Sequence, residues 1–308
     1  MIFGPGFPRS QDELRENLFR LFQRSFQSLA KSGHSLKVYR SSFELYGRLA
    51  AERWAQLTIW PEETALIERF AREAGLPGEP QAMVQKSLLL HAAAATWRRM
   101  LQGLGRDALL RLCVARGEEH LRAALDAKRG VLIAHCHTVF APLFWSWLEH
   151  KGIAPGVTLG HWAWEQGRKA GDRTDPKRAV PEMARELFAA SQTLRAGGLA
   201  HVFGDGVQGS RQTEIAFCNR RRGFRSTFAE MAVAADATTL SAAVSMGADG
   251  RMTMEIEPSF TDDASLPRAE RVERLVREYA ARLEKRWQRD AAQLPWGDMT
   301  THLRFPAL

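Results

Sequence analysis

The sequence predicts an α/β protein, with a mixed, mostly parallel sheet flanked by helices and a helical region before it. Up to Lys128 the apolar residues recur with helical spacing almost throughout. From Gly130 onward, short apolar runs alternate with helical patterns, which is typical of a sheet whose strands are joined by crossover helices. We therefore expect a helical region over residues 1–128 that packs on an α/β core over 129–308, the two forming one structural unit.

Capping signals and periodicity predict the helices of the first region. Ser10 and Glu13 match a capping box, and apolar and basic residues share the stretch 10–30. A basic amphipathic helix of this kind packs on the domain or lies in a membrane interface. Pro61 and the two glutamates after it suit the first turn of a helix within 36–75. After a break at 75–80, helices are expected over 81–103, 107–115 and 117–127.

The second region alternates strand and helix patterns. Its last apolar run, MTMEIEP, alternates with polar residues after the turn Ala248-Asp249-Gly250, which favours an antiparallel or edge strand. Strands are expected at 131–135, 155–160, 199–204, 238–245 and 252–257, and helices near 140–151, 180–196, 223–235 and 268–292.

Composition limits the partners and the compartment. The net charge of +8 among 308 residues suggests an anionic partner: a membrane face, an acidic carrier protein, a phosphorylated lipid or a nucleic acid. No helix-turn-helix, zinc or aromatic RNA-binding pattern is visible, so we expect no nucleic-acid partner. The three cysteines are far apart and odd in number, which predicts free thiols in a reducing compartment. We see no signal peptide, and the apolar stretches fall short of the ~20 residues of a membrane span, so membrane contact should be peripheral.

Two histidines end the first predicted strand. His135 and His137 are two residues apart, so in an extended chain they point to the same face. No second pair of metal ligands is recognisable elsewhere in the chain, and we expect no metal site. An imidazole is the side chain whose unperturbed pKa lies nearest neutral pH, so one of the two is a candidate general base.

An acid and an arginine cluster are the other candidates. Asp205 follows an apolar run and lies between two glycines, where it either meets a substrate or orients a histidine, or simply forms a turn. Four arginines then precede a helix expected to begin near Ser226. Guanidinium groups beside helical amides suit a phosphate, although a solvated loop is the alternative. These candidate substrate-binding residues are Arg220, Arg221, Arg222 and Arg225.

From about residue 36 to 296, these pieces stand in an order that resembles the bacterial lipid A late acyltransferases (lauroyl and myristoyl acyltransferases) of the lysophospholipid acyltransferase superfamily. The matching stretches are GVLIAHCHTVFAPL (130–143), AGGLAHVFGDGVQG (196–209), FAEMAVAADATTLSAAVSMGADGRMTMEIEPSF (228–260) and YAARLEKRWQRDAAQLPW (279–296).

The resemblance implies a lysophospholipid acyltransferase-like fold and transfer of a fatty acyl group. The donor would be acyl carrier protein or acyl-CoA, used as co-substrate without a further cofactor, and the acceptor a hydroxyl or amine of a lipid or small molecule. In the family a histidine followed five positions later by an acid acts as general base. Aligning through GVLIA puts this histidine at His137, but position 142 is Pro142.

Three explanations of the missing acid are open: Asp205 takes over the orienting role, His135 works with His137, or the chain keeps the fold and has lost the reaction. The family's arginine after the second strand is also absent, since Leu159-Gly160-His161 stands there, although Arg168 and Arg173 follow.

The first hypothesis is an acyltransferase with His137 as base, located peripherally on the cytoplasmic face of the inner membrane against anionic lipid. The alternative is a silent homologue that binds an acyl chain, a carrier protein or a membrane. A carboxylate within hydrogen-bond reach of the His137 ring would favour the enzyme.

Overall fold

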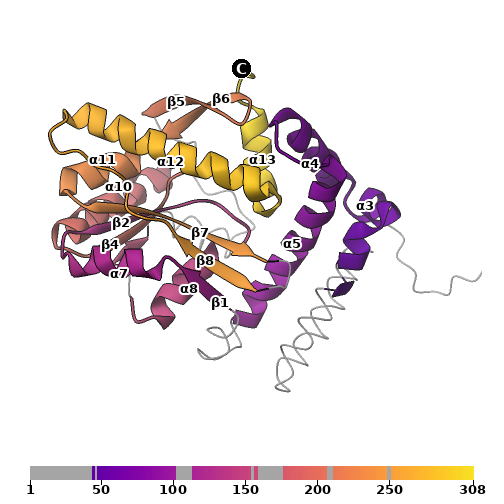
Figure 1. Cartoon of the computed structure of the whole chain (residues 1–308), viewed down its shortest axis with the longest axis horizontal. Coiled ribbons are helices and arrows are strands. Elements are labelled where there is room, and N and C mark those ends of the chain that lie inside the picture. Colours follow the sequence, from indigo (N-terminus) through magenta and orange to yellow (C-terminus); the bar gives the residue numbers. More distant parts are fainter. Residues whose placement is uncertain are drawn as a thin grey trace, which may run out of the picture.

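The computed structural model describes residues 44–45, 47–101, 113–153, 156–158, 176–206, 211–247 and 251–308. Within these ranges the chain forms a six-stranded sheet in the order β1-β8-β7-β2-β4-β3, flanked by helices (Figure 1). Neighbouring strands are parallel except for β7 and β8, which are antiparallel. The expected mixed, mostly parallel sheet flanked by helices is therefore confirmed. The strands of this sheet are β1 (Cys113–Arg116), β2 (Val131–His135), β3 (Val157–Thr158), β4 (Leu199–Phe203), β7 (Thr238–Met246) and β8 (Met252–Ile256).

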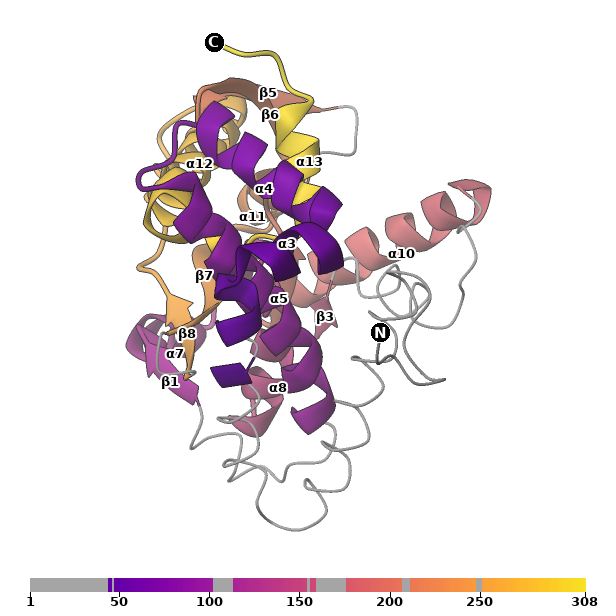
Figure 2. The same ribbon diagram turned by 90° about the vertical axis from the view of Figure 1, so that its right-hand side faces the viewer.

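The helices follow the expected order closely, and the first of them precede the sheet in the chain. Pro61 begins α4 and two glutamates occupy its first turn, as the sequence predicts. In Figure 2 the three helices nearest the N-terminus among the described residues lie in front of the sheet. The helices are α3 (Arg53–Ile59), α4 (Pro61–Glu73), α5 (Pro80–Leu101), α7 (Glu118–Asp126), α8 (Pro142–His150), α10 (Pro176–Arg195), α11 (Thr227–Ala235), α12 (Arg268–Asp290) and α13 (Trp296–Leu303), with a 3₁₀ turn η1 (Ala291–Gln293).

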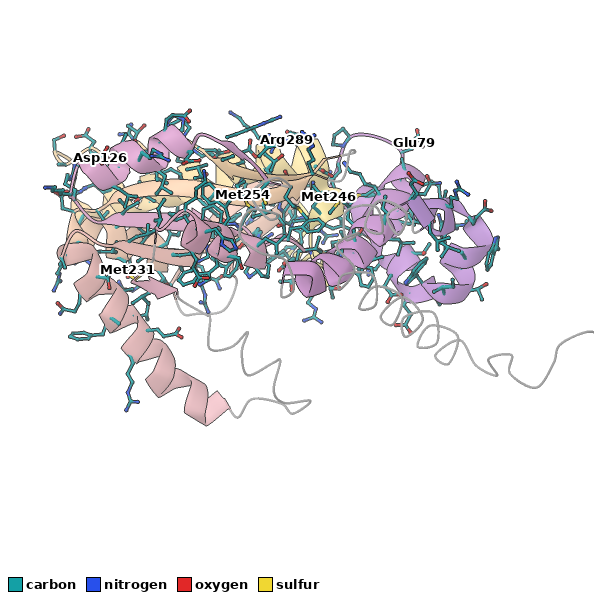
Figure 3. The ribbon with its side chains drawn as sticks, turned by 90° about the horizontal axis from the view of Figure 1, so that it is seen from below. Glu79, Asp126, Met231, Met246, Met254 and Arg289 are labelled. Carbon is teal, nitrogen blue, oxygen red and sulfur yellow. The ribbon has the colours of Figure 1, made fainter. Side chains whose placement is uncertain are left out.

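The central strands are buried on both faces, which explains why β2 is a continuous apolar run rather than an alternating one. Leu132 and Ala134 face a core that includes residues of α10, α11 and α12. Val131 and Ile133 face a second core that includes residues of α7 and α8. Figure 3 shows Met246 and Met254, from β7 and β8, lying between Asp126 and Glu79. The molecule therefore has a layer of helices on each side of the sheet.

Two local expectations are corrected by the structure, and one helix is new. Residues 113–116 form β1 at the edge of the sheet, whereas the sequence predicts a helix over 107–115; β1 pairs with β8, so tertiary pairing decides its conformation. The arginine-rich segment is a strand, β6 (Arg220–Arg225), not a loop, and it pairs antiparallel with β5 (Gln212–Phe217). Helix α13 near the C-terminus was not predicted. The helix expected over residues 10–30 lies outside the described residues.

A tight turn explains the β5–β6 hairpin. The two residues between its strands, Cys218 and Asn219, both have positive φ, at 44° and 58°. Two-residue hairpins need this backbone because its twist matches that of the strands, and asparagine tolerates it well. Asn219 was thus a turn signal that the surrounding charge obscured.

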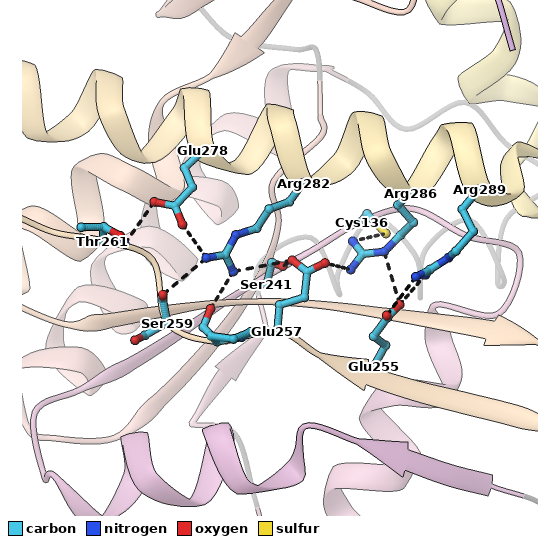
Figure 4. A network of polar contacts seen from close by, with 11 residues as sticks. Cys136, Ser241, Glu255, Glu257, Ser259, Thr261, Glu278, Arg282, Arg286 and Arg289 are labelled. Carbon is cyan, nitrogen blue, oxygen red and sulfur yellow. Dashed lines mark hydrogen bonds and ion pairs between the residues drawn. The ribbon is translucent and has the colours of Figure 1, made fainter.

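Arginines of α12 hold this helix against the end of β8 (Figure 4). Arg286 donates to Glu257 at 2.9 Å and contacts the sulfur of Cys136 at 3.6 Å, and Arg289 donates to both oxygens of Glu255 at 3.1 and 2.6 Å. Such bidentate, partly buried pairs are geometrically specific. They fix α12 beside Cys136, the residue that precedes His137.

In the part of the chain that the structure describes, no helix combines the length and apolar character that crossing a bilayer requires.

Two glycines with similar backbones provide a test of the packing around β8. Gly117 and Gly152 have φ of 74° and 71°, but a Cβ on Gly117 would lie 1.9 Å from the carbonyl oxygen of Ile256, whereas nothing lies within 4 Å of one on Gly152. Gly152→Ala should cost about 1–2 kcal/mol for the left-handed backbone alone. Gly117→Ala should cost more than about 3 kcal/mol, because backbone must also move. Urea denaturation measures both, and equal losses would contradict the described contact between Gly117 and β8.

Candidate active site

The candidate site lies where β2 and β4 end. The two strands are parallel, and His135 is paired with Phe203 in their register. His137 and Asp205 each come two residues after this pair, so the same register brings them side by side. In open α/β sheets ligands bind beyond the carboxyl ends of the strands, which is where these two residues lie.

Asp205 holds His137 through two hydrogen bonds. Its Oδ1 lies 2.6 Å from Nδ1 of the ring, and its Oδ2 accepts the backbone N–H of His137 at 2.8 Å. Because an ionised carboxylate only accepts hydrogen bonds, Nδ1 carries the proton and Nε2 is left for another partner. No hydrogen bond to Nε2 occurs among the described residues, and the side chain is 34% exposed. Phe203 stacks on the ring, with centroids 4.1 Å apart.

The loop that carries His137 is fixed along its length. The backbone N–H of Cys136 donates to the carbonyl of Ala242, and the hydroxyl of Thr138 donates to the carbonyl of Val244, at 3.2 and 2.8 Å. The N–H of Val139 donates to the carbonyl of Gln293 in η1 at 2.9 Å. With the His137 N–H held by Asp205, four consecutive residues are anchored. The imidazole is therefore presented in one orientation, as catalysis by a positioned base requires.

Gly204 lets the backbone just before Asp205 pass close to the ring of Tyr279 in α12. Gly204 donates its N–H to the carbonyl of His135 at 2.9 Å, and a Cβ on it would lie 2.7 Å from the ring of Tyr279. The Tyr279 hydroxyl donates to the same His135 carbonyl at 3.2 Å. Asp205 itself is 4% exposed. The turn is thus both the simple Gly-Asp-Gly turn and the means of orienting a histidine, two possibilities that the sequence leaves open.

Charges control protonation in the pair. Burial lowers the pKa of His137, but the negative charge and hydrogen bond of Asp205 outweigh it and raise the pKa to about 9. Burial raises the pKa of Asp205, but the charge of His137 and its hydrogen bonds outweigh this and keep the pKa below its usual value. The pair is therefore an imidazolium and a carboxylate at neutral pH, and the ring loses its proton in the alkaline range.

One charged residue near the pair was not recognised from the sequence, and a second was expected to bind substrate instead. Asp298 in α13 has its pKa raised to about 6 by burial and by the charge of Asp205, against the opposing charges of His137 and Arg222. Arg222 is 1% exposed and donates to the carbonyl of Asp205 at 2.9 Å. Asp298 lies far along the chain from His137, Asp205 and Arg222 and carries no motif, so only the tertiary fold reveals it.

His135 does not share the exposed site of His137. Its ring is fully buried on the α8 side of the sheet, against the rings of His201, Phe203 and Phe144 at 5.0–5.6 Å. Burial and the nearby cations hold its pKa well below the usual value, so it is neutral. Neither ring nitrogen has a hydrogen-bond partner among the described residues. The expectation that His135 faces a substrate together with His137 is therefore corrected. β2 ends at His135, so His137 lies in the following loop and its side chain does not continue the alternation of the strand.

The four arginines of the predicted anion site are separated by the strand that they form. Arg220 and Arg222 face inward: the first donates to the carbonyl of Phe305 at 2.6 Å and pairs with Glu73, and the second meets Asp205. Arg221 is exposed, and Arg225 is half-buried beside Gly206. The structure thus places Arg225 alone of the four next to the residue that follows Asp205, and corrects the expectation of one joint phosphate receiver.

Arg168 and Arg173 lie outside the described residues. Within those residues there is no group of three or more histidine, cysteine or acidic side chains that could hold a metal ion. Two tryptophans of α8 follow the first strand closely in the chain. Trp147 is buried in the core, and the indole N–H of Trp145 donates to Glu149 at 3.0 Å.

Replacing Asp205 should change the protonation of His137. In Asp205→Asn, the pKa of His137 should fall from about 9 to below 6.5, because burial then acts without the compensating carboxylate. NMR titration of the labelled imidazoles measures this pKa. Asp298→Asn is the matched control and should lower it less, since Asp298 contributes charge but no hydrogen bond. A His137 pKa near 9 in Asp205→Asn would contradict the described pairing.

Burial of His201 should make the protein sensitive to acid. Burial lowers its pKa to about 3, with a further contribution from the charge of His137, against 6.5 for an unburied imidazole. The unfolded chain therefore binds a proton that the folded protein refuses, so stability is lost as the pH falls below about 6.5. This one group should account for about 3 kcal/mol between pH 6.5 and pH 4.

Urea denaturation across that range should show a flatter pH dependence in His201→Phe than in the parent. His120→Phe, at a partly exposed position, is the control and should follow the parent. Parallel curves for His201→Phe and the parent would show that the ring is not buried as described.

The comparisons with known proteins assign no family. No protein-family model matches the chain, and none of the curated proteins matches it either. The similarity to lipid A late acyltransferases therefore stays a prediction that depends on the quoted sequence stretches. The geometry of His137 and Asp205 is therefore the main physical evidence for a function.

Proposed function

We propose that the protein is an acyltransferase that moves a fatty acyl group from a thioester donor, acyl carrier protein or acyl-CoA, to a hydroxyl or amine of a lipid or small molecule. The observation that carries the proposal is the oriented pair of His137 and Asp205, with Nδ1 held at 2.6 Å and Nε2 without a hydrogen-bond partner among the described residues. This is the arrangement of a general base with its orienting acid. The order of the sequence stretches supplies the reaction class.

The steps follow from the roles of the two residues. Neutral His137 accepts the proton of the acceptor hydroxyl or amine on Nε2 as the acceptor oxygen or nitrogen attacks the thioester carbonyl carbon. Asp205 stabilises the imidazolium that forms and keeps the ring in the correct tautomer. When the tetrahedral intermediate collapses, the carbon–sulfur bond breaks and the imidazolium returns the proton to the leaving thiolate. No acyl-enzyme forms, and no additional cofactor is consumed.

Asp205 takes the orienting role that the family motif gives to an acid at position 142. Pro142 is the first residue of α8, where its missing N–H has no helical partner to lose. The acid comes instead from the neighbouring strand, 68 residues later in the chain. This supports the active enzyme over the silent homologue, because an unassisted imidazole would have lost much of its orientation.

Donor binding is assigned to basic residues near the pair. Arg225 stands beside Gly206 and forms no ion pair with another described residue, so its charge is open to an anionic donor. Phosphates of a pantetheine arm or of CoA suit a guanidinium fork. The excess of basic residues fits an acidic carrier protein or an anionic membrane surface, and we place the protein peripherally on the cytoplasmic face of the inner membrane.

Acyl transfer from labelled acyl carrier protein and acyl-CoA to a panel of hydroxyl and amine acceptors tests the function. His137→Gln should lower kcat/KM by about 10²–10⁴-fold, the usual contribution of a positioned base. The parent rate should rise with pH toward about 9, because only the neutral ring accepts a proton. His150→Gln, in the last turn of α8, is the control and should transfer at the parent rate. Equal rates in His137→Gln and the parent would exclude His137 as the base.

A further inference from the structure

Arg222 is a buried cation in an aromatic enclosure. Its side chain is 1% exposed, and its guanidinium carbon lies 5.1 Å from the ring centroids of both Phe224 and Trp287 and 5.4 Å from that of Phe217. Cation–π contacts are strongest where water is excluded, as here. Among the described residues Arg222 forms no ion pair at 4.0 Å or less, so none of the carboxylates in these ranges is bonded to it directly.

The polar contact of this guanidinium is directed at the candidate site. One terminal nitrogen donates to the carbonyl oxygen of Asp205 at 2.9 Å. Its other two nitrogens, Nε and Nη1, are buried without a hydrogen-bond partner in the described part of the chain. Burying an arginine with two nitrogens unpartnered costs free energy, which contacts with the aromatic rings and attraction to nearby carboxylates offset. Asp205, in turn, holds both the ring and the backbone of His137.

The charge of Arg222 acts on the same group. It helps to keep the pKa of Asp205 low, and it opposes the rise in the pKa of His137 that Asp205 causes. Titratable groups from each element packed around Arg222 interact electrostatically with its charge. These groups are Asp205 after β4, His137 after β2, Asp298 and His302 in α13, Tyr279 in α12 and Cys218 in the hairpin turn.

We propose that Arg222 is a positioning residue for the His137–Asp205 pair: it anchors the backbone of Asp205 and supplies the positive charge that balances the buried carboxylate. It contacts neither acceptor nor donor and acts through Asp205. The effect of Arg222 on catalysis rests on the proposed function. The anchoring of Asp205 does not, because it needs no substrate. This role also replaces the expectation that Arg222 binds a substrate phosphate.

The first experiment removes the charge. NMR titration of labelled imidazoles in Arg222→Met should give a His137 pKa above that of the parent, by on the order of one pH unit, because an opposing cation is lost. Arg220→Met is the matched control: Arg220 is buried on the same face of β6 and bonds to Phe305, but it does not contact Asp205. It should leave the His137 pKa at the parent value. An unchanged pKa in folded Arg222→Met, with amide exchange at His137 also at the parent rate, would overturn the proposal.

The second experiment keeps the charge and removes the fork, and it remains informative if Arg222→Met does not fold. A lysine has no planar fork to reach the Asp205 carbonyl in the same geometry. In Arg222→Lys, amide hydrogen exchange at His137 should therefore be at least tenfold faster, since its N–H depends on Asp205 Oδ2. Arg220→Lys should match the parent, and parental protection in Arg222→Lys would contradict the anchoring role.

Neither measurement requires acyl transfer, so the two proposals fail separately. Changes in pKa and exchange without detectable acyl transfer would support Arg222 as a positioning residue and reject the proposed function. Acyl transfer by the parent, with no change in pKa or exchange in the Arg222 variants, would support the proposed function and reject Arg222 as a positioning residue. Where transfer is detected, Arg222→Lys should lower kcat and leave KM for the donor within twofold.

Discussion

The parallel pairing of β2 with β4 is the constraint on which the candidate site depends. Because His135 is paired with Phe203, the residues two places further along must also meet, and these are His137 and Asp205. A shift of one residue would bring different side chains together. Both strands are buried on the two faces of the sheet, so packing specifies this register strongly. The orientation of one imidazole is thus a consequence of how the central sheet is assembled.

Charge balance explains why several ionisable groups can be buried together at this point. Asp205 and Asp298 carry negative charge, and His137 and Arg222 carry positive charge, so the cluster is close to neutral. A buried charge without a partner would cost several kcal/mol or would neutralise. Burial raises the pKa of Asp298 to about 6, which shows how strongly the site disfavours a second negative charge. Removing any member therefore changes the pKa values of the others.

Much of the fold was predictable from local sequence signals. The apolar runs that form β2, β4 and β7 and the alternating run that forms β8 can be identified, and proline with acidic residues marks the start of α4. β1 and the β5–β6 hairpin were not. β1 has only four residues and forms by pairing at the sheet edge, and β6 consists largely of arginines. Their conformation depends on partners distant in sequence.

The site was predictable in its two principal residues but not in its geometry. His137 and Asp205 could be named because each follows a predicted strand, although their contact required the strand order. His135 could not be separated from His137, since spacing alone does not show where the strand ends. Asp298 belongs to a helix that the sequence did not predict, and the role of Arg222 depends on alternation along a strand taken for a loop.

The central claim is that Asp205 acts through His137 in acyl transfer, and a double-mutant cycle measures this directly. Transfer rates of the parent, His137→Gln, Asp205→Asn and the double variant give the coupling between the two residues. If the acid serves only to orient and charge the ring, Asp205→Asn should slow the parent but have no further effect once His137 is glutamine. Losses that multiply in the double variant would show that the two residues act independently, and would contradict this account.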